Sequence, residues 1–187
     1  MLTICYEWVG RSIKNYGDYL FKDVKLKMWE YFNSGFIVVN EKHFEFDESL
    51  FNQCPNEVSL FGFFQSEKYF KHIKDSLKED FTFRSHILEP CTEIAESFEN
   101  PVALHVRRTD YLTNSANHYN LELDYYKKAL EQFPDRQVIV FSDDPTWCHD
   151  EPTFNDDRFM ISESEDNSVD LCLMTFCSDY IIANSSF

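Results

Sequence analysis

Four short apolar runs recur in the second half of the chain, at residues 102–106, 137–141, 158–161 and 180–183. Each run is apolar almost throughout instead of alternating apolar with polar residues, which is typical of strands buried on both faces. Helical or loop-like segments separate the runs, and strands that alternate with helices form parallel sheets. The pattern therefore predicts an α/β domain built on a parallel sheet.

Two of the separating segments have the periodicity of helices. One begins near Asn120 and carries an apolar stripe on a single face, made of Leu123, Tyr126, Leu130 and Phe133. The other, residues 168–177, is apolar on nearly every face, as expected of a helix buried against a sheet.

The first half of the chain is less regular. Residues 35–39 predict a strand and residues 67–77 predict a helix, but the pattern defines no closed fold there. We therefore divide the chain into two regions, 1–98 and 99–187.

The α/β region contains no glycine, because the four glycines of the chain all precede it, at positions 10, 17, 35 and 62. A P-loop and a GxGxxG dinucleotide fingerprint both need glycine for the close approach of backbone to phosphate. The sequence therefore excludes both motifs. A nucleotide bound in this region would have to be held by side chains and helix termini.

The chain is strongly acidic, with a formal net charge of −16 and a pI of about 4.6. Such a charge attracts neither nucleic acid nor an anionic membrane, so neither is an expected partner. A ligand that carries phosphate would be repelled at long range and would need a local cationic pocket. Clustered arginines are for this reason more informative here than in a basic protein.

Cysteine usage and hydropathy indicate a reduced environment. The six cysteines show no CxxC spacing, and no apolar stretch approaches the roughly 18 residues of a membrane-spanning helix. The first ten residues lack the pattern of a secretory signal. We therefore expect a soluble cytoplasmic protein.

Polar residues follow each of the four predicted strands, at the edge of a parallel sheet where ligands bind. Arg107 and Arg108 follow the first strand, and guanidinium groups pair bidentately with phosphate oxygens. Because adjacent residues that leave a strand point in opposite directions, we expect one arginine to face a ligand and the other to brace the loop. Spacing alone leaves open that both are surface arginines that balance nearby acids.

Two aspartate doublets, at 143–144 and 156–157, raise the possibility of a metal site, since hard cations take carboxylate oxygens. No third ligand at a fixed spacing supports either doublet, and turns commonly use aspartate, so a structural role is favoured. His105 and His118 could each serve as a base or a ligand, although His105 lies inside an apolar strand and could be a hydrogen-bonded core residue.

Four segments, in order along the chain, resemble the α-1,2-fucosyltransferases of glycosyltransferase family 11. Residues 105–111, HVRRTDY, resemble the HxRRxDY motif, and residues 141–147, FSDDPTW, resemble the FSDD segment with its following tryptophan. A single block with DLCLM at 170–174 and IIANSSF at 181–187, and the upstream segment GFFQSEKYF at 62–70, are similar to two further family blocks.

The resemblance implies a GT-B-like architecture: a C-terminal Rossmann-like domain, residues 99–187, that binds GDP-fucose, and an incomplete N-terminal acceptor-side region, residues 1–98. It implies inverting transfer of fucose to a galactoside hydroxyl, with no metal and no other cofactor. The implied partners are GDP-fucose and a galactose-containing glycan, and a glycolipid acceptor would bring the protein to a membrane surface peripherally.

Site residues follow from the resemblance by position. Arg107 or Arg108 would hold the β-phosphate, and fixed cations there would stabilise the charge that develops on the departing GDP. His118, in the loop after the arginine motif, is the candidate base. The implied donor-binding set is His105, Arg107, Arg108, Asp110, Asp143, Asp170, Asn184, Ser185 and Ser186.

The sequence departs from the family pattern in three places. Thr109 stands where the α-1,2 group has glycine, and the chain shows neither a GGLGNQ-type start nor the SWWGAW segment that follows NSSF in relatives. We therefore expect a chain truncated at both ends. The alternatives are a catalytically inactive remnant of such an enzyme and a metal-dependent GT-A glycosyltransferase that uses an aspartate pair, although no DxD signature follows a strand.

Overall fold

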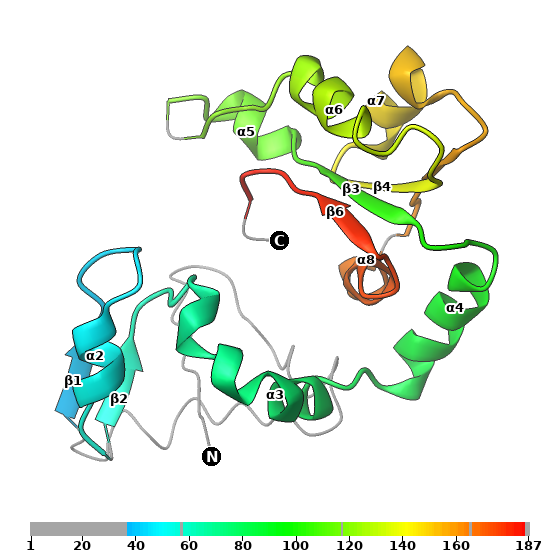
Figure 1. The fold of residues 1–187 in the computed structure, drawn as a ribbon. Coiled ribbons are helices and arrows are strands. Elements are labelled where there is room, and N and C mark those ends of the chain that lie inside the picture. Colours follow the sequence, from blue (N-terminus) through cyan, green and yellow to red (C-terminus); the bar gives the residue numbers. More distant parts are fainter. Residues whose placement is uncertain (1–36, 57, 117, 165, 186–187) are drawn as a thin grey trace. The chain divides into compact units, whose positions relative to one another are not determined.

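The computed structural model describes residues 37–56, 58–116, 118–164 and 166–185 (Figure 1). The chain divides into two compact units, and the division falls between Arg84 and Ser85. The second unit therefore begins before residue 99, where the sequence-based division begins its second region. The assignment of acceptor and donor sides to the two regions stays a prediction.

The first unit contains a pair of parallel strands, β1 (Ile37–Asn40) and β2 (Val58–Phe61), with the helix α2 (Glu48–Gln53) between them in sequence. The side chain of Asp47 caps α2 by accepting a hydrogen bond from the Leu50 N–H at 2.9 Å. The helical prediction for 67–77 is confirmed in pieces: η1 (Glu67–Tyr69), η2 (Lys71–Ile73) and α3 (Lys74–Asp80).

The second unit is built on the parallel sheet that the apolar runs predict. Its strands are β3 (Val102–Val106), β4 (Val138–Ser142), β5 (Phe159–Ile161) and β6 (Asp179–Ile181). They are ordered β5-β4-β3-β6, and every neighbouring pair is parallel. Along the chain, β4 and then β5 are added to the sheet on one side of β3, whereas β6 is added on the other side of β3. The strand order therefore reverses between β3 and β6.

Helices cover both faces of this sheet (Figure 1). On one side lie α4 (Ser85–Ala95) and α8 (Asn167–Met174), which pack against each other. On the other side lie α5 (Thr109–Thr113), α6 (Leu123–Leu130), α7 (Pro145–Asp150) and the short η3 (Pro152–Phe154). The sheet is thus the middle one of three layers, and burial on both faces explains why its strands are continuous apolar runs.

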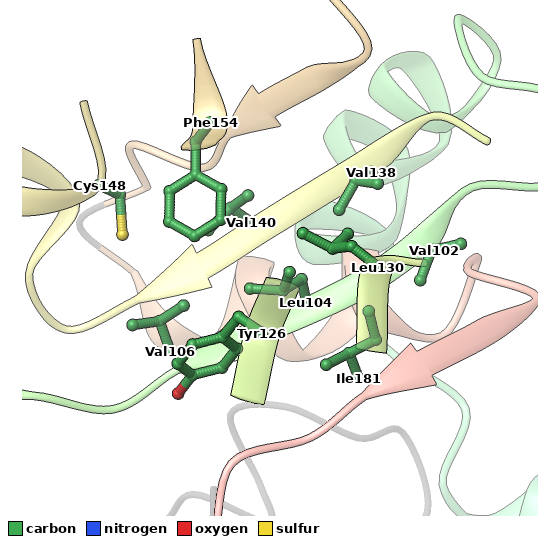
Figure 2. Close-up of a cluster of buried hydrophobic side chains, with 10 residues drawn as sticks. All are labelled: Val102, Leu104, Val106, Tyr126, Leu130, Val138, Val140, Cys148, Phe154 and Ile181. Atoms are coloured by element: carbon green, nitrogen blue, oxygen red, sulfur yellow. The ribbon is translucent and has the colours of Figure 1, made fainter. Parts of the chain in front are cut away.

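One apolar core lies between the sheet and the helices α6 and α7 (Figure 2). Alternate residues of β3 point into it, and Tyr126 and Leu130 reach it from α6. Its members are Val102, Leu104, Val106, Tyr126, Leu130, Val138, Val140, Cys148, Phe154 and Ile181. The predicted helical stripe is confirmed here, although α6 ends at Leu130 and Phe133 packs against the core from beyond the helix.

The second face of the sheet is buried as well. Ala103 and Ile139 are 3% and 0% exposed, and Ile87 of α4 and Leu173 of α8 are each 1% exposed. The cysteines at 54, 91, 148, 172 and 177 form no disulfide. Among the described residues, no helix combines the length and the apolar character that crossing a bilayer requires.

Candidate functional site

The arginine motif and the segment after β6 lie at the two strands between which the strand order reverses. Arg107 directly follows β3, and Asn184 and Ser185 follow β6 after a short extension. In open parallel α/β sheets, ligands bind outside the carboxyl ends of the strands at this kind of reversal. The predicted residues therefore meet the topological condition for a binding site. Ser186, the last of them, lies outside the described residues.

Arg107 is held by two carboxylates. Its Nε donates to Asp110 Oδ1 at 2.9 Å and lies 3.4 Å from Asp143 Oδ2. The bond with Asp110 raises the pKa of Arg107 and lowers the pKa of Asp110. The Asp110 side chain is 55% exposed, so water screens the stronger of the two contacts.

Arg108 takes a different direction and is more enclosed. Its guanidinium lies over the Trp147 ring, 3.8 Å from the ring centroid, and its Nε lies 3.3 Å from Asp144 Oδ2. Only 19% of its side chain is exposed. The two guanidinium groups thus contact different partners, as expected of adjacent residues that leave a strand.

Asp143 joins the loop after β3 to the loop after β4. Its Oδ1 accepts the Arg108 N–H at 2.9 Å, and its Oδ2 accepts the Thr109 N–H at 3.1 Å. The Thr109 hydroxyl donates to the same Oδ2. These contacts, together with Arg107, engage both oxygens of the carboxylate. Asp143 therefore holds the arginine loop in place, and Thr109 adds a bond that glycine could not make.

A second set of contacts ties the segment after β6 to this loop. The Tyr111 hydroxyl donates to the carbonyl of Asn184 at 2.9 Å, and the Asn184 side chain donates to the carbonyl of Tyr119 at 2.9 Å. The His118 ring stacks on the Tyr111 ring, with centroids 4.5 Å apart and planes 10° from parallel. His118 and Asn184, predicted as base and donor contact, therefore share Tyr111 as a neighbour.

His105 lies within β3 and is 9% exposed. Because the neighbouring residues Leu104 and Val106 point into the core of Figure 2, His105 points to the opposite face of the sheet. Burial lowers its pKa, and the positive charge of Arg107 lowers it further. The charge of Asp143 opposes this shift, and the net lowering of the pKa favours the neutral imidazole, which suits a hydrogen-bonding role.

Asp170 is a buried carboxylate at the start of α8, 6% exposed. The Ser162 hydroxyl, just past the end of β5, donates to its Oδ1 at 2.5 Å. Burial raises the pKa of Asp170, while the bond from Ser162 lowers it and the charge of Asp166 raises it. The structure thus keeps an ionisable group at the carboxyl edge of the sheet although burial penalises its charged form.

A cavity of about 550 Å³, lined mostly by polar residues, opens at the ends of β4 and β5. Its lining comes from the loop after β4, from α7, from the loop after β5 and from the start of α8. The lining residues are Ser142, Asp143, Pro145, Thr146, His149, Glu163, Ser164 and Asn167. His149 and Glu163 approach each other across the two loops, with 2.8 Å between Nε2 and Oε1.

The sequence did not single out Thr146, His149 and Asn167 as site residues. A usable signal was present, since Asp144 followed by Pro145 is the signature of a helix start. Asp144 does cap α7 by accepting the Trp147 N–H at 3.2 Å. Both aspartates of the doublet at 143–144 therefore make structural contacts, and the absence of a metal stays a prediction. The described residues contain no group of three or more His, Cys, Asp or Glu placed to hold a metal ion.

A parallel, doubly covered sheet with arginines and a polar cavity at its carboxyl edge defines a Rossmann-like α/β domain. The model of the family described as "Glycosyl transferase family 11" matches residues 20–187. The chain therefore belongs to glycosyl transferase family 11.

Individual relatives agree with this assignment. The chain is 35% identical to the O-antigen biosynthesis glycosyltransferase WbnK of Escherichia coli, over 78% of this chain and 53% of that protein. It is 31% identical to an alpha-1,2-colitosyltransferase of Escherichia coli, over 76% and 53% respectively. It is 24% identical to the galactoside alpha-(1,2)-fucosyltransferase 1 of Bos taurus, over 70% and 41%. The chain thus spans about half the length of the two bacterial relatives, and no solved structure is a significant match.

Proposed function

We propose that this protein acts in the transfer of fucose from GDP-fucose to a hydroxyl of a galactose-containing glycan. The observation that carries the proposal is the arginine motif at the point where the strand order reverses, in a chain of glycosyl transferase family 11. The acidity of the chain strengthens it, because a diphosphate would be attracted only by a local cluster of cations such as this one.

Arg107 provides the principal contact to the diphosphate. It meets its carboxylate partners through Nε, which leaves Nη1 and Nη2 for phosphate oxygens. In an inverting transfer, the acceptor oxygen bonds to C1 of fucose as the bond from C1 to the β-phosphate oxygen breaks. Negative charge then grows on the departing GDP, and a fixed guanidinium stabilises it; loss of one such contact costs about 3 kcal/mol of barrier.

The nucleoside occupies the cavity at the ends of β4 and β5. The lining offers hydroxyl, carboxylate and amide groups, which suit the hydrogen-bonding edges of a ribose and a base. Asp170 lies at the start of α8, as does the lining residue Asn167, and with His105 it completes the proposed donor site. Asn184, Ser185 and Ser186 contribute from the segment after β6.

His118 accepts the proton of the acceptor hydroxyl in this proposal. Its stacking on Tyr111 fixes the ring plane beside the arginine loop. Replacement of His118 by Ala then leaves GDP binding intact and removes turnover. A His118→Ala protein with full turnover would exclude this residue as the base.

The reaction proceeds without a metal in this proposal, because the Arg107 guanidinium takes the place of a metal cation at the diphosphate. The protein works in the cytoplasm, and a glycolipid acceptor would draw it to a membrane surface. The colitosyltransferase relative supports a second donor, GDP-colitose, whose sugar is fucose without its 3-hydroxyl.

Calorimetric titration of the full chain tests the proposal. GDP, GDP-fucose, GDP-colitose and UDP-galactose are titrated with and without Mn²⁺, and transfer to a galactoside is followed in parallel. We expect selective binding of the guanosine nucleotides without metal. Metal-dependent UDP binding would favour the GT-A alternative, and GDP-fucose binding without transfer would favour the inactive remnant.

A matched pair of arginine variants locates the binding. Arg107→Lys loses about tenfold or more in GDP affinity, because a charge-assisted bond is worth roughly 1.5–3 kcal/mol. Arg136→Lys is the control, since Arg136 pairs with Asp179 at the opposite edge of the same sheet, 3.1 Å apart. Equal losses in the two variants would contradict the proposed position of the site.

A further inference from the structure

We propose that Trp147 and Asp144 form a clamp that holds Arg108 as the brace of the arginine loop, and thereby positions Arg107 for the diphosphate. The proposal rests on the donor site proposed above and adds to it two positioning residues from α7. It also assigns different tasks to two adjacent residues of identical chemistry.

The contacts of Arg108 fix it at both ends. Its backbone N–H donates to Asp143, at 2.9 Å, and its guanidinium carbon lies over the Trp147 ring, 3.8 Å from the centroid. Its Nε lies 3.3 Å from Asp144 Oδ2. Movement of this side chain toward a ligand would therefore break a stacking contact and an ion pair together.

Both partners of the Arg108 guanidinium are parts of a single rigid unit. Asp144 is the cap of α7: its Oδ1 accepts the Trp147 N–H at 3.2 Å while its Oδ2 faces Arg108. The Asp144 N–H in turn donates to the Ser142 hydroxyl at 3.0 Å, and the Trp147 ring also meets Phe154 of the core edge-to-face, with ring centroids 6.2 Å apart. The clamp thus links the end of β3 to the core through the start of α7.

Arg107 has different surroundings, although its own side chain is only slightly more exposed than that of Arg108, at 27% compared with 19%. Its closest partner, Asp110, is 55% exposed, and its aromatic neighbour Tyr111 is 5.8 Å from the guanidinium carbon, compared with 3.8 Å for Trp147 and Arg108. A screened pair is easily exchanged for a more highly charged diphosphate, whereas a stacked and enclosed guanidinium is not. The geometry therefore leaves Arg107 available for the donor and retains Arg108 in the scaffold.

The clamp is tested by comparing Trp147→Leu with Trp147→Phe, which keeps an aromatic face. The first readout needs no ligand: hydrogen exchange of the amides of Arg108 and Thr109, which donate to Asp143. We expect exchange about tenfold faster in Trp147→Leu and nearly unchanged in Trp147→Phe. Equal exchange in all three proteins would overturn the clamp.

The second readout compares GDP with GMP, which lacks the β-phosphate. We expect Trp147→Leu to weaken GDP binding about tenfold and to leave GMP binding within about twofold, because only the position of the arginine has changed. Equal loss for both nucleotides would indicate general damage to the fold and would refute the positioning role.

Arginine variants separate the two tasks. Arg107→Lys lowers GDP affinity with little change in amide exchange, whereas Arg108→Lys accelerates exchange at Arg108 and Thr109. The reverse assignment of effects would overturn the proposal. Failure of the unmodified protein to bind either nucleotide would instead refute the proposed donor site, and the clamp would then be decided by amide exchange alone.

Discussion

The buried pair of Ser162 and Asp170 leads to a quantitative prediction for Ser162→Ala. The serine hydroxyl donates to Asp170 Oδ1 at 2.5 Å, and the two residues are 9% and 6% exposed. A hydrogen bond to a charged group contributes roughly 1.5–3 kcal/mol, compared with roughly 0.5–1.5 kcal/mol for a neutral pair. At neutral pH we therefore expect Ser162→Ala to lower the free energy of unfolding by about 1.5–3 kcal/mol. For a chain of this size, the midpoint of thermal unfolding would fall by roughly 3–12 °C.

The effect depends on pH with a definite sign. Burial raises the pKa of Asp170, so the folded state binds the proton more tightly than the unfolded state does. The penalty for its charge is therefore relieved as pH falls through the folded-state pKa. Removal of Ser162 raises this pKa further, so the cost of Ser162→Ala is largest at neutral pH and smaller in acid, below the folded-state pKa.

Denaturant unfolding of four proteins measures the coupling: wild type, Ser162→Ala, Asp170→Asn and the double variant. Once Asp170 is neutral, Ser162→Ala should cost only about 0.5–1.5 kcal/mol. Ser97→Ala is the control, because that exposed hydroxyl donates only to the neutral carbonyl of Ile94, at 2.7 Å. An identical cost of Ser162→Ala with and without the Asp170 charge, or at neutral and acid pH, would refute the reasoning.

Three further outcomes are expected. Burial raises the pKa of Tyr126 to about 12 from an ordinary value near 10, so the unfolded state ionises first and the stability of the wild type falls between about pH 10 and 12. In Tyr126→Phe, roughly 2–3 kcal/mol of this decline should be missing from unfolding curves recorded at alkaline pH. Parallel curves for the two proteins would contradict the burial argument. Leu104→Ala should lower the free energy of unfolding by about 2–5 kcal/mol in urea, since Leu104 is 0% exposed in the core, and a cost under about 1 kcal/mol would mean that the core collapses around the cavity. Thr109→Val removes the hydroxyl that donates to Asp143, so hydrogen exchange of the backbone amide at position 109 should become faster. The midpoint of thermal unfolding should stay within a few degrees of that of the wild type. Unchanged exchange would mean that Asp143 holds the loop without this bond.

Much of the second unit could be predicted from the sequence because its signals are local. Strands that are buried on both faces must be apolar throughout, and this marked β3 to β6 to within two residues at either end. The absence of glycine after Gly62 excluded backbone-cradled phosphate sites by simple steric reasoning. The positions of the arginines at the end of β3 followed from the same pattern.

Strand order could not be predicted in this way, because it depends on contacts between segments far apart in the sequence. Only the order β5-β4-β3-β6 places Arg107 and Asn184 at the two strands that flank the reversal. The placement of α4 in the second unit likewise results from its packing on α8. No local pattern in residues 85–95 predicts this contact.

The amino-acid sequence by itself determined that two arginines leave a buried strand at an edge of polar residues in an acidic chain. It could not assign different roles to Arg107 and Arg108, because the two side chains have the same charge and the same donors. The proposed distinction rests on tertiary structure, which places Trp147 and Asp144 against Arg108 and the exposed Asp110 beside Arg107. The physical reason lies in the partners of each guanidinium: Arg108 lies against the Trp147 ring, whereas Arg107 pairs with an exposed carboxylate that water screens and that a ligand can replace.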